Sequence, residues 1–401
     1  MTICLVCNEY PPLPHGGIGT YCQTMARELV RRGERVIVAG SAADGTDSAR
    51  VDHGVKVVHF SLGSASHSQH TPRIIRAARL LRQRLAFSRR LRDSLDALGV
   101  DLVEAPDWSA PLLLHQNRAL VVRLHGSHSV SCLAAGVRPS RLMRILERRA
   151  LNMAARCVAV SRHILHATRR TLALGLPDAL VIHNGVDTDL FTPDPLSSST
   201  GASILYVGSV KKLKGMFELF RAFQEVHSSF PHATLTLVGA IDRGDGGSLD
   251  EVLLASLPQS ARSAVKFLGR QPLSNLPMIY QSHSIAVNTS LAEAFGLTCA
   301  EAMACGLPVV MTARGSGPEL IEHQRTGLLV EPTDTPALVV AIKSLLQDSC
   351  LRQSLGKEAR LAAAARFSVK AMADSSLDLY HNLICAAHVL QAGTSIRRAG
   401  I

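Results

Sequence analysis

Short apolar runs alternate with longer amphipathic stretches along nearly the whole chain. In the first half, apolar runs predict strands, and apolar residues at helical spacing predict helices. After a stretch rich in Pro and Ser the same alternation begins again, which is typical of α/β layers built on a parallel sheet. The strands are expected at 2–7, 35–39, 102–104, 120–124, 157–160, 203–208 and 234–239, and the helices at 18–32, 140–155 and 217–228.

The Pro- and Ser-rich stretch at 191–201 indicates a linker between two Rossmann-like domains. At 401 residues the chain is too long for one ordinary core, which agrees with two domains. We therefore expect a first domain over 1–190, a second over 202–366, and a C-terminal helix within 367–390. Because open parallel sheets bind ligands beyond the carboxyl ends of their strands, such domains predict a central cleft.

The composition is that of a globular protein, with 47% hydrophobic and 19% charged residues. No uninterrupted apolar run approaches the ~20 residues of a membrane-spanning helix. The N-terminal run lacks the basic preface and cleavage site of a signal peptide, so we expect a cytoplasmic protein. Cys4 and Cys7 form a lone CxxC on a predicted strand, where residues three apart face opposite sides, so we expect no metal site there.

The net charge is +11, and eight arginines lie between Arg73 and Arg92 among Ile and Leu residues. Basic amphipathic stretches form solvated faces of helices, and they also form helices that lie on anionic membranes. Peripheral contact with the inner membrane face therefore stays open. Nucleic-acid binding is not expected, because only 4% of residues are aromatic and no recognised module is present.

Glu293 and Glu301 stand with seven residues between them around a glycine turn. Gly306 and Pro308 end a short helix of small residues that contains Glu301, whereas Glu293 belongs to the loop before it. If all nine residues from Glu293 to Glu301 were helical, the two carboxylates would lie ~12 Å apart along the helix axis, a distance that suits contacts with two ends of one ligand. Backbone amides at the start of this helix would favour a phosphate dianion. These amides belong to Phe295, Gly296, Leu297 and Thr298.

Three loops after predicted strands carry further candidates. The first contains Gly16 and Gly17, but a dinucleotide fingerprint is disfavoured because Cys22 stands where its third glycine belongs. His125 follows the strand at 120–124, at the expected cleft mouth. Lys214 lies after the strand at 203–208, where a mobile point charge can neutralise a departing nucleotide.

Residues 290–330, which contain Glu293, the glycine turn and Glu301, resemble the donor-binding region of retaining glycosyltransferases of family 4. That family carries E-x7-E in an EGFG-like turn followed by EAMA-x-G-x-PVV, and Ala294 replaces its usual Gly or Ser. The loop of Gly16 and Gly17 is similar to the family's P-x-x-GG-x-G loop, and His125–Gly126 is similar to its HG pair. Residues 208–215 resemble G-R-x4-KG, with Ser209 in place of the arginine.

The resemblance implies a GT-B fold, an α/β architecture of two Rossmann-like domains facing a central cleft, with a C-terminal helix that crosses back to the first domain. It implies a retaining, metal-independent transferase that moves a hexose from a UDP- or GDP-sugar to a hydroxyl acceptor. The acceptor would be a sugar, a lipid-linked sugar or a small molecule in polysaccharide, glycolipid or small-glycoside biosynthesis. Neither the donor nor the acceptor can be identified from the sequence.

The resemblance also assigns roles within the site. Glu301 would hold the ribose and Glu293 the hydroxyls of the donor sugar, while His125 would lie near the reacting centre. Because Ser209 replaces the family arginine, we predict that Lys211 or Lys212 supplies the second cation. The predicted catalytic residues are His125, Glu293 and Lys214, and the predicted donor contacts are Gly16, Gly17, Ser209, Lys214, Glu293, Phe295, Gly296, Leu297, Thr298 and Glu301.

No metal or other cofactor is expected. Asp187, Thr188 and Asp189 spell the DxD motif of metal-dependent glycosyltransferases of another fold, but they lie beside the hinge rather than at the end of a nucleotide-binding strand. Two alternative functions stay open. One is a nucleotide-sugar epimerase of the same architecture, which would convert donor without an acceptor. The other is a non-catalytic sensor, which would bind a sugar nucleotide without converting it.

Overall fold

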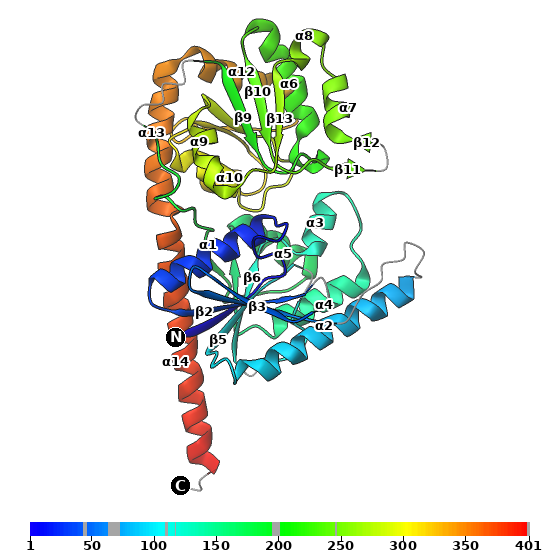
Figure 1. The fold of residues 1–401 in the computed structure, drawn as a ribbon, viewed down its shortest axis with the longest axis vertical. Coiled ribbons are helices and arrows are strands. Elements are labelled where there is room, and N and C mark those ends of the chain that lie inside the picture. The colour runs from blue at the N-terminus through cyan, green and yellow to red at the C-terminus, as the bar shows by residue number, and fades with distance from the viewer. Residues whose placement is uncertain are drawn as a thin grey trace. The chain divides into compact units, whose positions relative to one another are not determined.

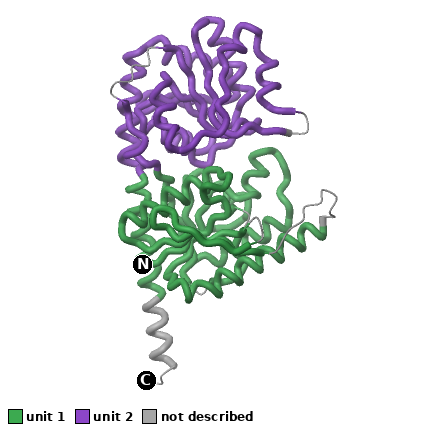
Figure 2. Tube along the Cα trace, viewed as in Figure 1, with its two compact units in different colours: residues 1–185, 369–401 green, residues 186–368 purple. Residues whose placement is uncertain are grey.

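The structure is a computed structural model that describes residues 1–42, 46–62, 73–108, 111–116, 118–194, 201–244 and 247–398. The chain divides into two compact units, one formed by residues 1–185 and 369–401 and the other by residues 186–368 (Figure 2). Both are α/β units built on a mainly parallel sheet, as the sequence predicts.

The first unit holds an eight-stranded sheet in the order β3-β4-β2-β1-β5-β6-β7-β8 (Figure 1). All its strand pairs are parallel except β3 with β4. The central strand β1 is buried along its whole length, which is why it is a continuous apolar run rather than an alternating one. The strands are β1 (Thr2–Val6), β2 (Arg35–Ser41), β3 (Ser48–Asp52), β4 (Val55–Phe60), β5 (Leu102–Pro106), β6 (Ala119–Leu124), β7 (Arg156–Ala159) and β8 (Leu180–Val181).

The helices of the first unit include the last helix of the chain. That helix, α14, packs against α1 and β6, and its buried Met372 and Tyr380 join the core that α1 forms with β1 and β2. The C-terminal segment therefore belongs to the first unit. The helices are α1 (Gly17–Arg31), α2 (Arg73–Leu95), α3 (His128–Ala134), α4 (Arg141–Asn152), α5 (Arg162–Leu172) and α14 (Val369–Arg398).

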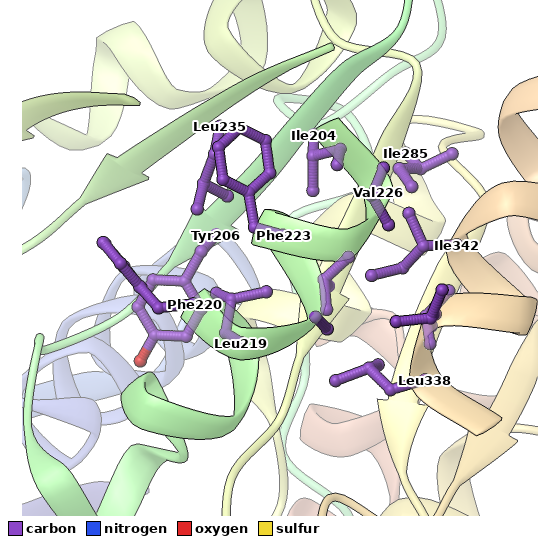
Figure 3. Packing of buried hydrophobic residues seen from close by; sticks show 14 of the residues in the cluster. Ile204, Tyr206, Leu219, Phe220, Phe223, Val226, Leu235, Ile285, Leu338 and Ile342 are labelled. Atoms are coloured by element: carbon purple, nitrogen blue, oxygen red, sulfur yellow. The ribbon is translucent and has the colours of Figure 1, made fainter. Parts of the chain in front are cut away.

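The second unit holds a six-stranded parallel sheet in the order β13-β10-β9-β14-β15-β16, and a two-stranded ribbon of β11 and β12. Figure 3 shows its core, where Phe220 and Phe223 of α6 lie near Tyr206 and Leu235 of the sheet, and Val226 of the same helix lies near Ile342 of α12. Apolar residues three or four apart give α6 this buried face. The strands are β9 (Ser203–Val207), β10 (Thr234–Val238), β11 (Arg243–Gly244), β12 (Gly247–Ser248), β13 (Val265–Gly269), β14 (Ile285–Asn288), β15 (Val309–Thr312) and β16 (Leu328–Val330).

Short helices alternate with these strands. They are α6 (Met216–Ser229), α7 (Leu249–Ala255), α8 (Gln259–Arg262), α9 (Leu276–Gln281), α10 (Leu297–Ala304), α11 (Gly317–Leu320), α12 (Thr335–Gln347) and α13 (Ser349–Arg366), with 3-10 turns η1 (Lys212–Lys214) and η2 (Leu273–Asn275). Among the helices of the described ranges, none has the length and apolar character that a membrane crossing requires.

The unit boundary differs from the predicted one. The first unit ends at Gly185 rather than at residue 190, and Phe191 packs edge-on against Tyr280 in the second unit. Burial of the large apolar side chain of Phe191 is favourable, so the start of the predicted linker packs as part of the second unit. Residues 367 and 368 also belong to the second unit, because Ser368 pairs with Val186. Residues 195–200 of the predicted linker lie outside the described ranges.

Candidate active site

Glu293 is a buried carboxylate in the loop after β14. Its Oε2 accepts hydrogen bonds from Lys214 Nζ at 2.9 Å and from Asn288 Nδ2 at 3.3 Å. Lys214 ends η1 in the loop after β9, so the ion pair joins the loops of two neighbouring strands. Burial by itself raises the pKa of Glu293, but the Lys214 ammonium and the hydrogen bonds outweigh it and hold that pKa below its usual value.

The loop that carries Glu293 is held by the loop that follows β15. Ser316 donates from its amide to the Glu293 carbonyl at 3.1 Å and from Oγ to the Phe295 carbonyl at 2.8 Å. Gly315 fits against this loop so closely that a Cβ there would lie 2.3 Å from the Glu293 carbonyl oxygen. Gly296 has φ +92°, a conformation that glycine adopts without strain.

Helix α10 begins directly after this turn, with Gly296 as its N-cap. Its first residues are Leu297 and Thr298, and the first amides of a helix have no acceptor within the helix itself. The sequence predicts that these amides face a phosphate, and the structure places them directly after the loop that carries Glu293. The helix dipole adds a partial positive charge at the same end.

Glu301 lies in the body of α10 and is almost fully buried. Its Oε2 accepts a hydrogen bond from the Tyr280 hydroxyl at 2.7 Å, and that hydroxyl also lies 3.0 Å from the Thr298 carbonyl oxygen. Burial raises the pKa of Glu301 to about 7, against the opposing effect of the Tyr280 hydrogen bond. The carboxyl therefore changes its charge near neutral pH.

The remaining lysines of the predicted cation cluster are exposed. Lys211 and Lys212 precede Lys214 around η1, and both side chains face solvent. The Ser209 carbonyl accepts a hydrogen bond from the Tyr206 hydroxyl at 2.9 Å, which fixes the start of the turn. Gly215 closes it, because a Cβ there would lie only 1.9 Å from the Thr289 carbonyl oxygen.

In the first unit, His125 follows β6 at the carboxyl edge of the sheet. Its amide donates to Asp107 Oδ1 at 2.9 Å, and its ring contacts that of Tyr21 with centroids 4.9 Å apart. Burial and the cation of Arg123 lower the pKa of His125 to about 3, so the imidazole is neutral at physiological pH. Burial raises the pKa of Asp107 to about 7, and neighbouring Glu147 adds to the rise.

The glycine loop before α1 is folded around a carboxylate. Glu9 Oε1 accepts from the amide of Gly16 at 3.2 Å and from that of Gly19 at 2.8 Å. The Gly16 amide, which the sequence predicts to face a donor, is thus directed to Glu9 in this structure. Gly17 is the first residue of α1.

The DxD triplet lies in a local turn. Asp187 Oδ1 accepts from the amides of Asp189 and Leu190, both at 3.1 Å. Within the described ranges, no group of three or more His, Cys, Asp or Glu side chains is placed to hold a metal ion.

The structure gathers the predicted residues into two sets, one in each unit. Lys214, Glu293, Glu301 and the start of α10 form the set of the second unit, and His125 with the glycine loop forms that of the first. Sequence reasoning missed Asn288, Tyr280, Tyr21 and Asp107. The sequence could have indicated Asn288, because it is a polar residue at the carboxyl end of an apolar strand, where parallel sheets bind ligands.

Two family models match the chain. Residues 15–190 match the model described as Glycosyltransferase Family 4, and residues 188–362 match the model described as Glycosyl transferases group 1. The chain belongs to the group 1, family 4 glycosyltransferases. The predicted family is confirmed, and the protein is an enzyme of the glycosyltransferase class.

Similar proteins cover nearly the full length of this glycosyltransferase. A glycogen synthase of Mycobacterium tuberculosis is 26% identical over 409 residues, which is 95% of this chain and 94% of that protein. A D-inositol 3-phosphate glycosyltransferase of Corynebacterium jeikeium is 27% identical over 396 residues, which is 93% of each.

Solved structures show the same architecture. Sucrose-phosphate synthase from Thermosynechococcus elongatus aligns with a TM-score of 0.80 at 23% identity, covering 96% of this chain and 99% of that one. Anabaena HepE in complex with UDP-glucose aligns with a TM-score of 0.73 at 21% identity, covering 96% and 100%. The predicted GT-B fold is confirmed.

Proposed function

We propose that this glycosyltransferase retains configuration while it moves a hexose from a UDP- or GDP-sugar to a hydroxyl acceptor. The observation that carries the proposal is the Lys214–Glu293 ion pair, whose carboxylate lies on the loop that leads into α10, the helix that carries buried Glu301. A cation, backbone amides at a helix N-terminus and two carboxylates are the groups needed for the diphosphate and the hydroxyls of a sugar nucleotide. HepE was crystallised with UDP-glucose, so a UDP-sugar is the first donor to test.

Each group has an assigned part in donor binding. The amides of residues 295–298 and Lys214 hold the diphosphate, with Lys211 or Lys212 as the second cation. Glu301, oriented by Tyr280, accepts hydrogen bonds from the ribose hydroxyls. Glu293 accepts from hydroxyls of the hexose, and Asn288 helps to orient its carboxylate. Gly16 and Gly17 bring backbone close to the donor, and Ser209 lies at the same turn as the lysines.

The reaction we propose is a front-face displacement at the anomeric carbon. The bond from that carbon to the diphosphate oxygen breaks, the bond to the acceptor oxygen forms on the same face, and the acceptor proton passes to the departing phosphate oxygen. Lys214 and the helix amides stabilise the charge that develops on the leaving group. His125 is neutral, so its imidazole can hydrogen-bond a sugar hydroxyl near the reacting centre without adding a charge.

Calorimetric titration tests the donor site. We expect wild type to bind one of UDP-glucose, UDP-N-acetylglucosamine and GDP-mannose, and Glu301→Ala to lose that binding. Glu225→Ala, an exposed carboxylate on α6, is the matched control and should bind as wild type does. Equal donor affinity in wild type and Glu301→Ala would contradict the ribose role, and failure to bind any nucleotide sugar would contradict the transferase proposal.

A turnover assay with and without acceptor separates the alternative functions. A transferase consumes donor only when an acceptor is present. An epimerase would convert the donor alone, and a sensor would bind it without conversion. The relatives named glycogen synthase and D-inositol 3-phosphate glycosyltransferase favour transfer.

We also propose that the enzyme works in the cytoplasm and touches the inner membrane face through the first half of α2. Ile74 and Ile75 are 82% and 50% exposed, and Arg76 and Arg82 are exposed beside them. The second half of the helix is less suited to this contact, because Arg90 pairs with Asp47 at 2.6 Å. Exposed aliphatic groups among cations are typical of helices that lie on anionic lipid. Such contact would bring the site to a lipid-linked acceptor.

A further inference from the structure

Tyr21 on α1 is the aromatic neighbour of His125. Its ring is buried, lies with its centroid 4.9 Å from that of the imidazole, and is also 4.9 Å from the guanidinium carbon of Arg123. Arg123 and His125 are two residues apart at the end of β6, which places their side chains on one side of the strand. Tyr21 therefore contacts both the candidate catalytic ring and the cation beside it.

Among the described residues, no hydrogen bond to either ring nitrogen of His125 is formed. The packing of the imidazole against Tyr21 therefore has a large part in orienting it. The imidazole and the Tyr21 ring both line a small pocket of about 10 Å³, together with residues of β1, α1 and β5. Removing the Tyr21 ring would enlarge this pocket and leave the imidazole room to turn.

Tyr21 is itself held by a closed polar network. Its hydroxyl donates to Glu104 Oε1 at 2.5 Å, and the Tyr380 hydroxyl donates to Oε2 of the same carboxylate at 2.6 Å. Arg123 completes the shell, with Nε 3.0 Å from Oε1 and Nη2 3.2 Å from Oε2. A buried carboxylate with four donors is fully satisfied and rigid. The last helix thus contributes to the support beneath His125 through Tyr380.

We propose that Tyr21 is a positioning residue for His125, which fixes the plane of the half-buried imidazole and shields one face of it from water so that it stays neutral during turnover. The Glu104 carboxylate, with Tyr380 behind it, fixes Tyr21 in turn. The inference rests on the proposed function, in which His125 meets the donor sugar.

The charges around His125 explain why it would stay neutral. The ionisable groups that surround it are Arg123 on its own strand, Glu104 and Asp107 on and after β5, and Tyr21 and Cys22 on α1. Burial and the Arg123 cation disfavour a second positive charge and lower the pKa of His125 to about 3, while Glu104 acts in the opposite direction. Removing the Tyr21 ring admits water, so this pKa should rise toward its usual value of about 6.5.

The test compares Tyr21→Leu with the conservative Tyr21→Phe, which keeps the ring. We expect Tyr21→Leu to lower kcat by about 10-fold, the effect of one hydrogen bond lost in the transition state, while donor affinity by calorimetry changes less than about 2-fold. Tyr21→Phe should restore most of the turnover. Nuclear magnetic resonance of ring-labelled histidine, with His125→Gln to assign the signal, should show His125 neutral above pH 5 in wild type and titrating between pH 5 and 7 in Tyr21→Leu.

Three results would overturn the inference. The first is a wild-type His125 that titrates near pH 6.5, and the second is a Tyr21→Leu enzyme with wild-type turnover. The third is an equal loss of turnover in Tyr21→Leu and Tyr21→Phe without a change in the His125 titration. If Tyr21→Leu does not fold, the wild-type titration and the Tyr21→Phe turnover still decide. A protein that binds no nucleotide sugar contradicts the proposed function instead, and leaves the His125 titration as a separate result.

Discussion

Lys214 Nζ lies 2.9 Å from Glu293 Oε2, so the lysine assigned to the donor diphosphate neutralises the carboxylate assigned to the donor sugar. Glu293 is buried, whereas the Lys214 side chain is 29% exposed. The pair therefore has one fixed partner and one that can move. A diphosphate entering beside the lysine would share its charge without leaving the carboxylate unpaired.

Lys214→Met should weaken both donor binding and the fold. The loss of one charge-assisted contact lowers donor affinity by roughly 10- to 100-fold. Buried Glu293 also loses its cation, which should lower the free energy of unfolding by about 1–3 kcal/mol. Calorimetry and thermal unfolding measure the two effects. In the Glu293→Gln background, where no charge remains to be compensated, Lys214→Met should cost less stability, and an unchanged cost would argue against the pair.

Donor binding should depend on the ionisation of Glu301. Its pKa is raised to about 7, and the ionised carboxylate is the better acceptor for ribose hydroxyls, so donor affinity should rise from pH 6 to pH 8. Tyr280→Phe removes a hydrogen bond that favours the charged form, which should move the midpoint to higher pH. Glu301→Gln should abolish the dependence. A pH-dependence that persists in Glu301→Gln would assign it to another group.

The same shift predicts the pH dependence of stability. The pKa of Glu301 is higher in the folded state than in the unfolded state. At pH values between these two pKa values, the folded state therefore binds more protons than the unfolded state. The contribution of Glu301 to stability is thus fully present at acid pH and is lost as pH rises through about 7. Denaturant unfolding at pH 5 and pH 8 measures this effect. The free energy of unfolding should fall less between the two pH values in Glu301→Gln than in wild type.

Lys211 or Lys212 is predicted to supply the second cation, because Ser209 stands in place of the family arginine. Lys211→Ala combined with Lys212→Ala should reduce donor affinity by roughly 10-fold at low salt and by less at high salt, because exposed charges are screened. Lys266→Ala, an exposed lysine on β13, is the control and should leave affinity unchanged. Wild-type affinity in the double variant would leave the second cation unassigned.

Gly215→Ala should be strongly destabilising. Gly215 has φ +69°, and a Cβ there would lie 1.9 Å from the backbone oxygen of Thr289. A backbone clash combined with a left-handed conformation should lower the free energy of unfolding by about 2–4 kcal/mol. Gly201→Ala, at a site with open space around the glycine, should change it little. Equal unfolding midpoints for the two variants would contradict the close approach of the two loops.

Membrane contact predicts salt-sensitive binding to vesicles of phosphatidylglycerol. Wild type should sediment with them at low salt and be released at high salt. Ile74→Ser combined with Ile75→Ser should reduce binding, whereas Val340→Ser, at an exposed aliphatic residue of α12, should not. No sedimentation at low salt would remove the proposed contact.

Features that depend on a few neighbouring residues could be predicted from the sequence alone. The strands at 2–6 and 203–207 are continuous apolar runs, and Gly296 and Pro308 bound the helix that carries Glu301. The local sequence therefore predicts that Glu293 lies in the loop and Glu301 in the helix. Motif spacing likewise indicates the family, because the glycine turn and the two carboxylates that flank it lie within one short segment.

Partners that are far apart in the sequence were decided only by the tertiary structure. Tyr280 meets Glu301 from another helix, and Tyr380 meets Glu104 from the end of the chain. No local pattern marks these tyrosines, since a buried aromatic residue has the same helical spacing whether or not its hydroxyl has a carboxylate partner. The position of Phe191 in the second unit was likewise set by its packing on Tyr280, which the Pro- and Ser-rich sequence after it could not reveal. Periodicity records which face of an element is buried, whereas the identity of the group that it meets depends on how the elements pack.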